Sequence, residues 1–171
     1  MSSIPNAESF LAMIETNKGI IYKVANSYCR NEENKKDLIQ EIILQLWLSW
    51  DKYDTAFKIS TWMYRIALNV SISFYRKEHR RNQITHPLPD NILLLQENQQ
   101  QGHLSYDVEM LHRSIRELRE MDRALIILHL EGNSHQEISD ILGLTTTNVS
   151  TKILRIKQEL KQKLSHLQSK K

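Results

Sequence analysis

Residues 133–157, NSHQEISDILGLTTTNVSTKILRIK, decide how the C-terminal part of the chain folds. Ser134 precedes Glu137 by three positions, a spacing at which the two side chains satisfy the free amides at a helix start. Gly143 is expected to end this helix, because glycine readily adopts the positive φ that a sharp turn requires. The stretch therefore predicts a short helix, a tight turn and a second helix.

The second helix is expected to be capped by Thr145 or Thr146 and to have two distinct faces. Apolar residues recur at helical spacing and predict the buried stripe, which consists of Val149, Ile153, Ile156, Leu160 and Leu164. Donor-rich side chains, the types that read base edges and hold phosphates in a major groove, occupy the other positions. The predicted DNA-binding residues of this helix are Thr147, Asn148, Thr151, Lys152, Arg155 and Lys157.

Charge is segregated in this part of the chain, although the whole sequence of 171 residues has 23 basic and 20 acidic side chains. Residues 107–144 contain 4 basic and 8 acidic side chains, whereas residues 145–171 contain 7 basic and 1 acidic. A basic face that follows an acidic segment indicates a surface built to meet an anion.

The remainder of the sequence predicts an all-α protein made of two small helical domains joined by a flexible linker. Residues 83–106 contain no Lys or Arg, five Gln and two Pro, which is typical of a linker. Eleven of the twelve aromatic residues lie between Phe10 and Tyr75, so the two domains differ in composition. The predicted boundaries are 1–82 for the first domain, 83–106 for the linker and 107–171 for the second domain.

Helical spacing of apolar residues predicts three helices in the first domain. The first begins near Glu8, and the run 17–19 allows a break or a bend in it. The second extends from about Asn34 to Trp50, and the third opens at Ser60 or Thr61 and reaches a basic cluster. Residues expected in the core of these helices include Leu38, Ile42, Leu46, Trp62, Ile66 and Val70. In the second domain, Arg113, Arg116, Arg119 and Arg123 alternate with acids and are expected to form a solvated face.

Several classes of protein are excluded or disfavoured by composition. The single cysteine, Cys29, favours a reducing, cytoplasmic compartment and is expected to be a buried small hydrophobe. We expect no secretion signal and no membrane insertion, because no apolar run approaches the length of a membrane span. The seven histidines are scattered, and neither a phosphate-binding glycine loop nor metal-ligand spacing is found, so we expect no enzyme, no metal and no cofactor.

Residues 35–81 resemble region 2 of the sigma-70 family, closest to its extracytoplasmic-function class. The resemblance rests on an Asp-Leu-x-Gln-Glu run at 37–41, an aromatic segment at 53–57, a Thr-Trp-x-Tyr-Arg-Ile-Ala-x-Asn helix at 61–69 and basic pairs at 76–77 and 80–81. Residues 109–164 likewise resemble region 4 of that class, with Val149, Lys152 and Arg155 in its helix.

The resemblance implies a sigma factor that binds core RNA polymerase and directs it to promoters. The implied polymerase-docking residues, used by the family against the clamp helices, are Asp37, Gln40, Glu41, Leu44 and Trp47. Region 4 is expected to contact the polymerase flap and to read the minus-35 element. The loop from Tyr53 to Ser60 is expected to capture a flipped base of the melted minus-10 element. The implied DNA contacts in region 2 are Tyr53, Phe57, Lys58, Asn69, Arg76, Lys77, Arg80 and Arg81. The resemblance also implies an anti-sigma factor as a partner.

Two other classes of function remain open at this point. An autonomous helix-turn-helix regulator with an N-terminal sensing or dimerisation domain would bind duplex DNA without polymerase, usually as a symmetric dimer. A purely interacting helical protein, such as an adaptor, would not need the basic face of the last helix.

Overall fold

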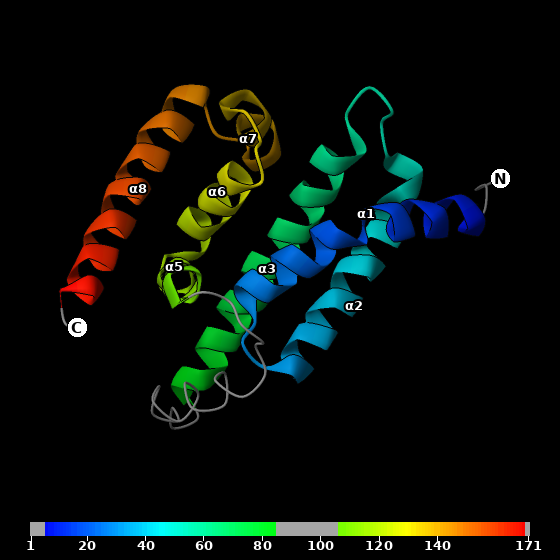
Figure 1. Ribbon diagram of the computed structural model, residues 1–171. Coiled ribbons are helices and arrows are strands. Elements are labelled where there is room, and N and C mark those ends of the chain that lie inside the picture. Colours follow the sequence, from blue (N-terminus) through cyan, green and yellow to red (C-terminus); the bar gives the residue numbers. More distant parts are fainter. Residues whose placement is uncertain (1–5, 85–105, 170–171) are drawn as a thin grey trace.

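The computed structural model describes residues 6–84 and 106–169, and every regular element within these ranges is a helix, as the sequence predicted (Figure 1). The elements are α1 (Ala7–Tyr28), α2 (Glu32–Ser49), the 3-10 turn η1 (Trp50–Lys52), α3 (Ile59–Ile84), α5 (Tyr106–Arg116), α6 (Glu120–Leu130), α7 (His135–Leu142) and α8 (Thr146–Gln168). Helices α1 to α3 pack on one another and form the N-terminal unit. Helices α5 to α8 form the C-terminal unit, in which α8 contacts the other three.

Helix α1 begins at a cap and continues past the predicted point of weakness. The Asn6 side chain accepts a hydrogen bond from the Glu8 N–H at 3.1 Å, which satisfies one of the free amides of the first turn. The break allowed for residues 17–19 does not occur, because the helix runs unbroken to Tyr28. Glycine in a helix costs about 1 kcal/mol relative to alanine. Burial of residues on both sides of Gly19, such as Phe10 and Ile21, outweighs that cost.

The core of the N-terminal unit lies where α1, α2 and α3 meet. On α2 the buried residues Leu38, Ile42 and Leu46 follow one another at intervals of four, which confirms the predicted stripe. Helix α3 starts at Ile59, one or two residues before the predicted start, so Ser60 and Thr61 lie inside the helix and do not cap it. The further buried apolar residues of this unit are Phe10, Ile21, Val24, Ala25, Tyr28, Cys29, Met63, Tyr64, Ala67, Leu68 and Ile72.

The helix-turn-helix of the C-terminal unit forms as its sequence predicts. The Ser134 hydroxyl accepts a hydrogen bond from the Glu137 N–H at 3.1 Å, and the Glu137 carboxylate accepts one from the Ser134 N–H at 2.8 Å. Gly143 ends α7 at φ 69° and ψ 28°, in the left-handed region. The Thr145 hydroxyl accepts from the Asn148 N–H and caps α8. The stripe of α8 is buried at Val149, Ile153, Ile156 and Leu160 and half-buried at Leu164.

Replacing Gly143 with alanine is expected to lower the free energy of unfolding by about 1 kcal/mol. No atom lies within 4 Å of an added Cβ, so the penalty comes from the left-handed backbone and not from a clash. Chemical denaturation measures the change. Gly19→Ala is the matched control, because that site is also open but lies inside a helix, and alanine is expected to stabilise it. Equal stabilities of the two variants would contradict the role assigned to the turn.

The two units pack against each other through α6 and α7, which contact α3, and through α5 and α6, which contact α1. Helix α6 is therefore buried from Asp122 to Leu128. The expectation that Arg123 belongs to a solvated face is wrong, since only 2% of this residue is exposed. The alternation of acidic and basic residues around Arg123 suggested a surface position, but α6 packs against helices of its own unit on one side and against α1 and α3 on another. Arg113 and Arg119 are exposed, as expected.

Candidate nucleic-acid interface

The first two turns of α8 present the donor face that the sequence predicted. Because Val149 and Ile153 point inward, Thr147, Asn148 and Thr151 are left exposed on the opposite side. These short polar side chains stand near the N-terminus of α8, the end by which recognition helices of this motif enter a major groove.

Arg155 belongs to the same face and is held in place by a residue that the sequence did not indicate. Its Nη2 lies 3.1 Å from both carboxylate oxygens of Asp122, a buried residue of α6. The Arg155 side chain nevertheless keeps 59% of its surface exposed. Asp122 therefore fixes the direction of the guanidinium and leaves its outer side open to a phosphate or a base. Lys152, between Arg155 and Asn148 on the face, is half-buried.

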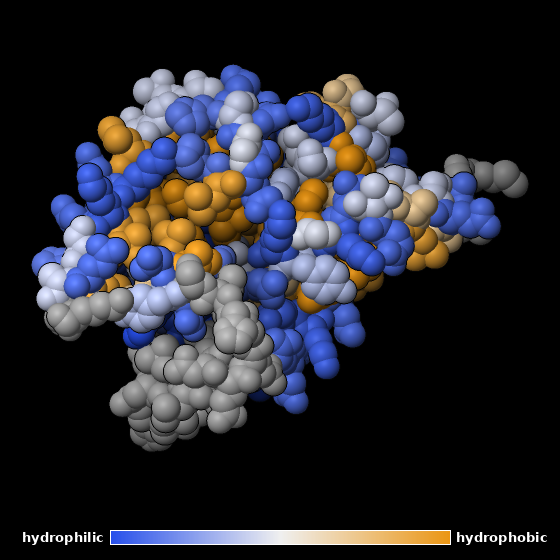
Figure 2. All heavy atoms as spheres, in the orientation of Figure 1, coloured by the Kyte–Doolittle hydropathy of each residue, from blue (hydrophilic) through white to orange (hydrophobic). Residues whose placement is uncertain are grey.

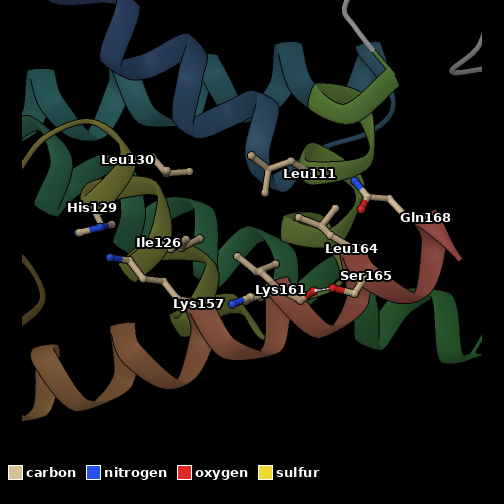
Figure 3. Close-up of a pocket in the computed structure, with 10 residues that line it drawn as sticks. Leu111, Ile126, His129, Leu130, Lys157, Lys161, Leu164, Ser165 and Gln168 are labelled. Atoms are coloured by element: carbon tan, nitrogen blue, oxygen red, sulfur yellow. Dashed lines mark hydrogen bonds between the residues drawn. The ribbon is translucent and has the colours of Figure 1, made fainter.

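Lys157 does not join these residues. It lies on the other flank of α8, where it lines a groove with His129 and Ile126 of α6 (Figure 3). Figure 2 shows that apolar side chains gather over α5, α6 and α8 on this face of the molecule. Burial, followed by the charges of Lys157 and His135, lowers the pKa of His129. The structure thus brings five of the six residues predicted on α8 together and separates the sixth.

The loop between η1 and α3 carries a cluster of aromatic rings. Trp50 and Tyr53 are stacked, with ring centroids 5.9 Å apart and ring planes 6° from parallel. The centroid of the Tyr53 ring lies 5.1 Å from that of the Trp62 ring. The Tyr53 hydroxyl donates to the Phe57 carbonyl at 2.7 Å, which closes the loop. The Phe57 ring stays half exposed. Trp62 is half-buried against these rings, so it belongs to the loop as much as to the core.

The basic residues predicted in the N-terminal unit lie near the two ends of α3. Lys77, Arg80 and Arg81 are exposed near the C-terminal end. Arg76 Nε lies 2.7 Å from a carboxylate oxygen of Glu120, and Lys58 Nζ lies 2.8 Å from a carboxylate oxygen of Glu137. Asn69 is exposed in the middle of α3, about 15 Å along the helix from Ile59.

A separate face, made by α1 and α2, contains the predicted docking residues. Asp37, Gln40, Glu41 and Leu44 are exposed on α2, and Trp47 packs edge-to-face against Phe10 with ring centroids 5.0 Å apart. Together α1 and α2 form an apolar groove lined by Ala7, Phe10, Leu11, Gln40, Ile43, Leu44 and Trp47. Sequence reasoning missed Leu11, which is 62% exposed. The available signal was that Leu11 is apolar although it directly follows the core residue Phe10 and so points to another side of α1.

Cys29 is buried at the end of α1, as the sequence predicted. Burial raises the pKa of its thiol to about 11. We expect Cys29 of the folded protein to react with a thiol-alkylating reagent at pH 8 roughly 100-fold more slowly than in denaturant, because only the thiolate is nucleophilic. Mass spectrometry of timed samples measures both rates, and equal rates would contradict the burial.

Residues 6–84 and 106–169 contain no cluster of three or more His, Cys, Asp or Glu side chains suited to a metal ion. None of the described helices has the combination of length and apolar character that crossing a bilayer requires.

The fold and the exposed face of α8 define a helix-turn-helix protein with a second helical unit. Two family models match the chain in order, namely Sigma-70 region 2 at residues 13–81 and Sigma-70 region 4 at residues 108–160. The chain is 27% identical over 143 residues to the RNA polymerase sigma factor SigV of Bacillus subtilis, covering 83% of this chain and 82% of the relative. It is 25% identical over 170 residues to the ECF RNA polymerase sigma factor SigW of the same organism, covering 94% and 91%.

A solved structure has a similar fold. The sigma factor RpoE of Bartonella quintana, crystallised with the anti-sigma factor NepR, matches with a TM-score of 0.67 and 20% identity, covering 92% of this chain and 95% of the other. The chain therefore belongs to the sigma-70 family, as a sigma factor of the extracytoplasmic-function class. The comparisons support this interpretation and not the alternative of an autonomous regulator.

Proposed function

We propose that this sigma factor joins core RNA polymerase and directs it to promoters by reading a minus-35 element with α8 and a melted minus-10 element with the 53–60 loop. The observation that carries the proposal is that both sigma-70 regions match one chain in sequence order. The chain acts as a binding subunit and not as an enzyme, and it works in the cytoplasm with the polymerase.

For the minus-35 element, α8 supplies the contacts to duplex DNA. Thr147, Asn148 and Thr151 are placed to reach base edges, since they are exposed at the helix start. Arg155, oriented by Asp122, and Lys152 are placed to hold phosphates beside them. Lys157, on the other flank, is left out of this assignment.

For the minus-10 element, the 53–60 loop supplies a stacking surface for an unpaired base. Phe57 offers an exposed ring, and Tyr53 is fixed by stacking on Trp50. Stacking of a base on an aromatic side chain contributes about 1–3 kcal/mol. The basic residues assigned to the adjoining phosphates are Lys58, Arg76, Lys77, Arg80 and Arg81, with Asn69 as a further contact.

For the polymerase, the docking residues of α2 combine acid, amide and apolar groups on one exposed face. Such a face suits a basic, partly apolar helical partner, which in this family is the pair of clamp helices, while the C-terminal unit meets the flap. The similar structure from Bartonella quintana is a complex with an anti-sigma factor. We include an anti-sigma factor among the partners of this chain.

Reconstituted transcription tests the proposal. Purified chain and core polymerase are incubated with a library of DNA fragments, the bound fragments are sequenced, and transcripts are mapped on the selected templates. We expect discrete start sites that share two non-symmetric elements. A symmetric dimer of the chain bound to a palindrome, with polymerase output unchanged, would support the autonomous regulator instead.

Lys152→Ala is expected to reduce initiation at promoters that depend on the minus-35 element by about fivefold, because one phosphate contact is lost. Binding to core polymerase in the absence of DNA is expected to stay unchanged. Lys163→Ala is the matched control, since Lys163 pairs with Glu117 and Glu159 within the C-terminal unit. Competition between promoters with and without the upstream element measures the effect, and an equal loss for both variants would contradict the assignment.

A further inference from the structure

The function proposed above gives no role to a leucine in the middle of the outer side of α8. Leu154 is 60% exposed, although its neighbours on the apolar stripe, Ile153 and Ile156, are buried. A single exposed leucine needs no explanation on an ordinary protein surface. This leucine, however, lies on the helix that is assigned to the major groove, where its apolar surface meets DNA and not water.

The position of Leu154 around α8 turns it toward the groove. Helix α8 lies at the edge of the molecule, and α5, α6 and α7 pack along its inner side (Figure 1). Thr151 is near the centre of the outer side, with Arg155 about 40° around the axis to one side of it and Leu154 about 60° to the other. Because Arg155 is assigned to a phosphate at one edge of the groove, Leu154 is turned away from that edge and toward the base pairs.

The residue beside Leu154 also offers a methyl group instead of a donor. Thr151 is exposed, but its hydroxyl donates to the Thr147 carbonyl at 3.0 Å, so the hydroxyl hydrogen is used within the helix. Thr151 therefore presents a methyl group and an acceptor oxygen to DNA. Leu154, three residues later, is its neighbour on the helix surface and presents methyl groups alone. Together these two residues make the outer side of α8 locally apolar.

One group in the major groove matches an apolar side chain. It is the C5-methyl of thymine, since the other base edges present ring nitrogens, carbonyl oxygens or amino groups. A leucine that covers a polar base atom takes away its hydrogen bond to water and returns none. Covering the thymine methyl costs no hydrogen bond and removes apolar surface from water.

We propose that Leu154 is a specificity-determining residue, which packs against the C5-methyl of a thymine in the minus-35 element with the Thr151 methyl beside it. The proposal rests on the minus-35 role proposed for α8 above and names one base that this helix selects. Burial of one methyl group corresponds to a preference of about fourfold for thymine over a base without it. Polymerase docking, which is assigned to α2, does not depend on this contact.

Selection from a DNA library by holoenzyme tests the choice of base. Core polymerase is combined with wild-type chain or with Leu154→Gln, and the bound fragments are sequenced. We expect wild type to enrich thymine about fourfold at one position of the upstream element. Leu154→Gln is expected to lose this preference and to prefer adenine at the same position, because glutamine pairs with adenine N6 and N7. The preferences at the other positions are expected to stay as in wild type.

Deoxyuridine in place of that thymine tests the methyl contact itself, because uracil differs from thymine only in lacking the C5-methyl. Wild-type holoenzyme is expected to bind the uracil template about fourfold more weakly. Leu154→Ala holoenzyme is expected to bind the two templates within about 1.5-fold of each other, since its partner for the methyl is gone. Leu130→Ala is the matched control, because it truncates an exposed leucine of α6, and it is expected to show the wild-type loss. Circular dichroism checks that each variant keeps its helices.

Equal binding of the thymine and uracil templates by wild type would overturn the assignment of Leu154, as would the same fourfold loss in Leu154→Ala. An upstream element without a preferred thymine, or one that Leu154→Gln leaves unchanged at every position, would overturn it too. Failure of holoenzyme to select any upstream element is a different result, because it removes the minus-35 function of α8 and the assignment of Leu154 with it.

Discussion

Arg123→Ala is expected to lower the free energy of unfolding by about 3 kcal/mol, the largest effect on stability predicted for a polar residue of this protein. The substitution removes a buried cation that binds three carbonyls and covers two tyrosine rings. The carbonyls at the ends of α1 and α5 lose a charged donor, and a cavity forms between the units. Urea denaturation followed by circular dichroism measures the change.

Two further variants make this prediction specific. Arg119→Ala removes an exposed arginine four residues earlier, which makes no side-chain cap on α6, and is expected to change stability by less than about 0.5 kcal/mol. Arg123→Lys keeps the charge but not the planar fork, so it is expected to recover only part of the loss. A loss in Arg119→Ala as large as that in Arg123→Ala would show that helix propensity, and not the buried contact, determines the effect.

Leu44→Asp is expected to weaken binding to core polymerase about thirtyfold, equivalent to about 2 kcal/mol. Leu44 is 48% exposed and lines the apolar groove between α1 and α2. A carboxylate there must be desolvated when a partner covers the groove. Because the side chain is exposed in the free protein, the fold is expected to tolerate the change. Fluorescence anisotropy of labelled chain titrated with core polymerase measures the affinity.

The control for this prediction is Leu154→Asp, which makes the same substitution at an exposed leucine of α8. In the absence of DNA it is expected to leave polymerase affinity within about twofold of wild type. Equal affinities of Leu44→Asp and wild type would exclude the groove as the docking surface. The same result would leave the DNA-binding assignment of α8 intact.

Much of the C-terminal unit could be predicted from the sequence because its signals act over a few residues. The Ser134–Glu137 capping box joins positions three apart, and the left-handed turn depends on Gly143 alone. The buried stripe of α8 follows from helical periodicity. The family resemblance predicted that region 2 precedes region 4 in the chain. The two family models match in that order, which confirms the prediction.

The break allowed for residues 17–19 is a feature that the local sequence could not decide. Glycine lowers helix propensity, but burial of residues on both sides of Gly19 keeps α1 continuous. The mistaken assignment of Arg123 has the opposite cause. A charged residue flanked by other charged residues is typical of a surface segment. Arg123 is buried only because α6, which belongs to the C-terminal unit, also packs against α1 and α3 of the N-terminal unit.

The sequence by itself determined the helical class of the fold, the caps of α7 and α8, the inward faces of α2 and α8 and the donors on α8, because each depends on neighbours within about one turn. The tertiary structure alone decided which charges meet. Lys58 and Glu137 are 79 positions apart, Arg76 and Glu120 are 44 apart, and Arg155 and Asp122 are 33 apart. Coulombic and hydrogen-bonding partners are set by distance in space, and that distance is fixed only when the packed apolar faces have placed the helices.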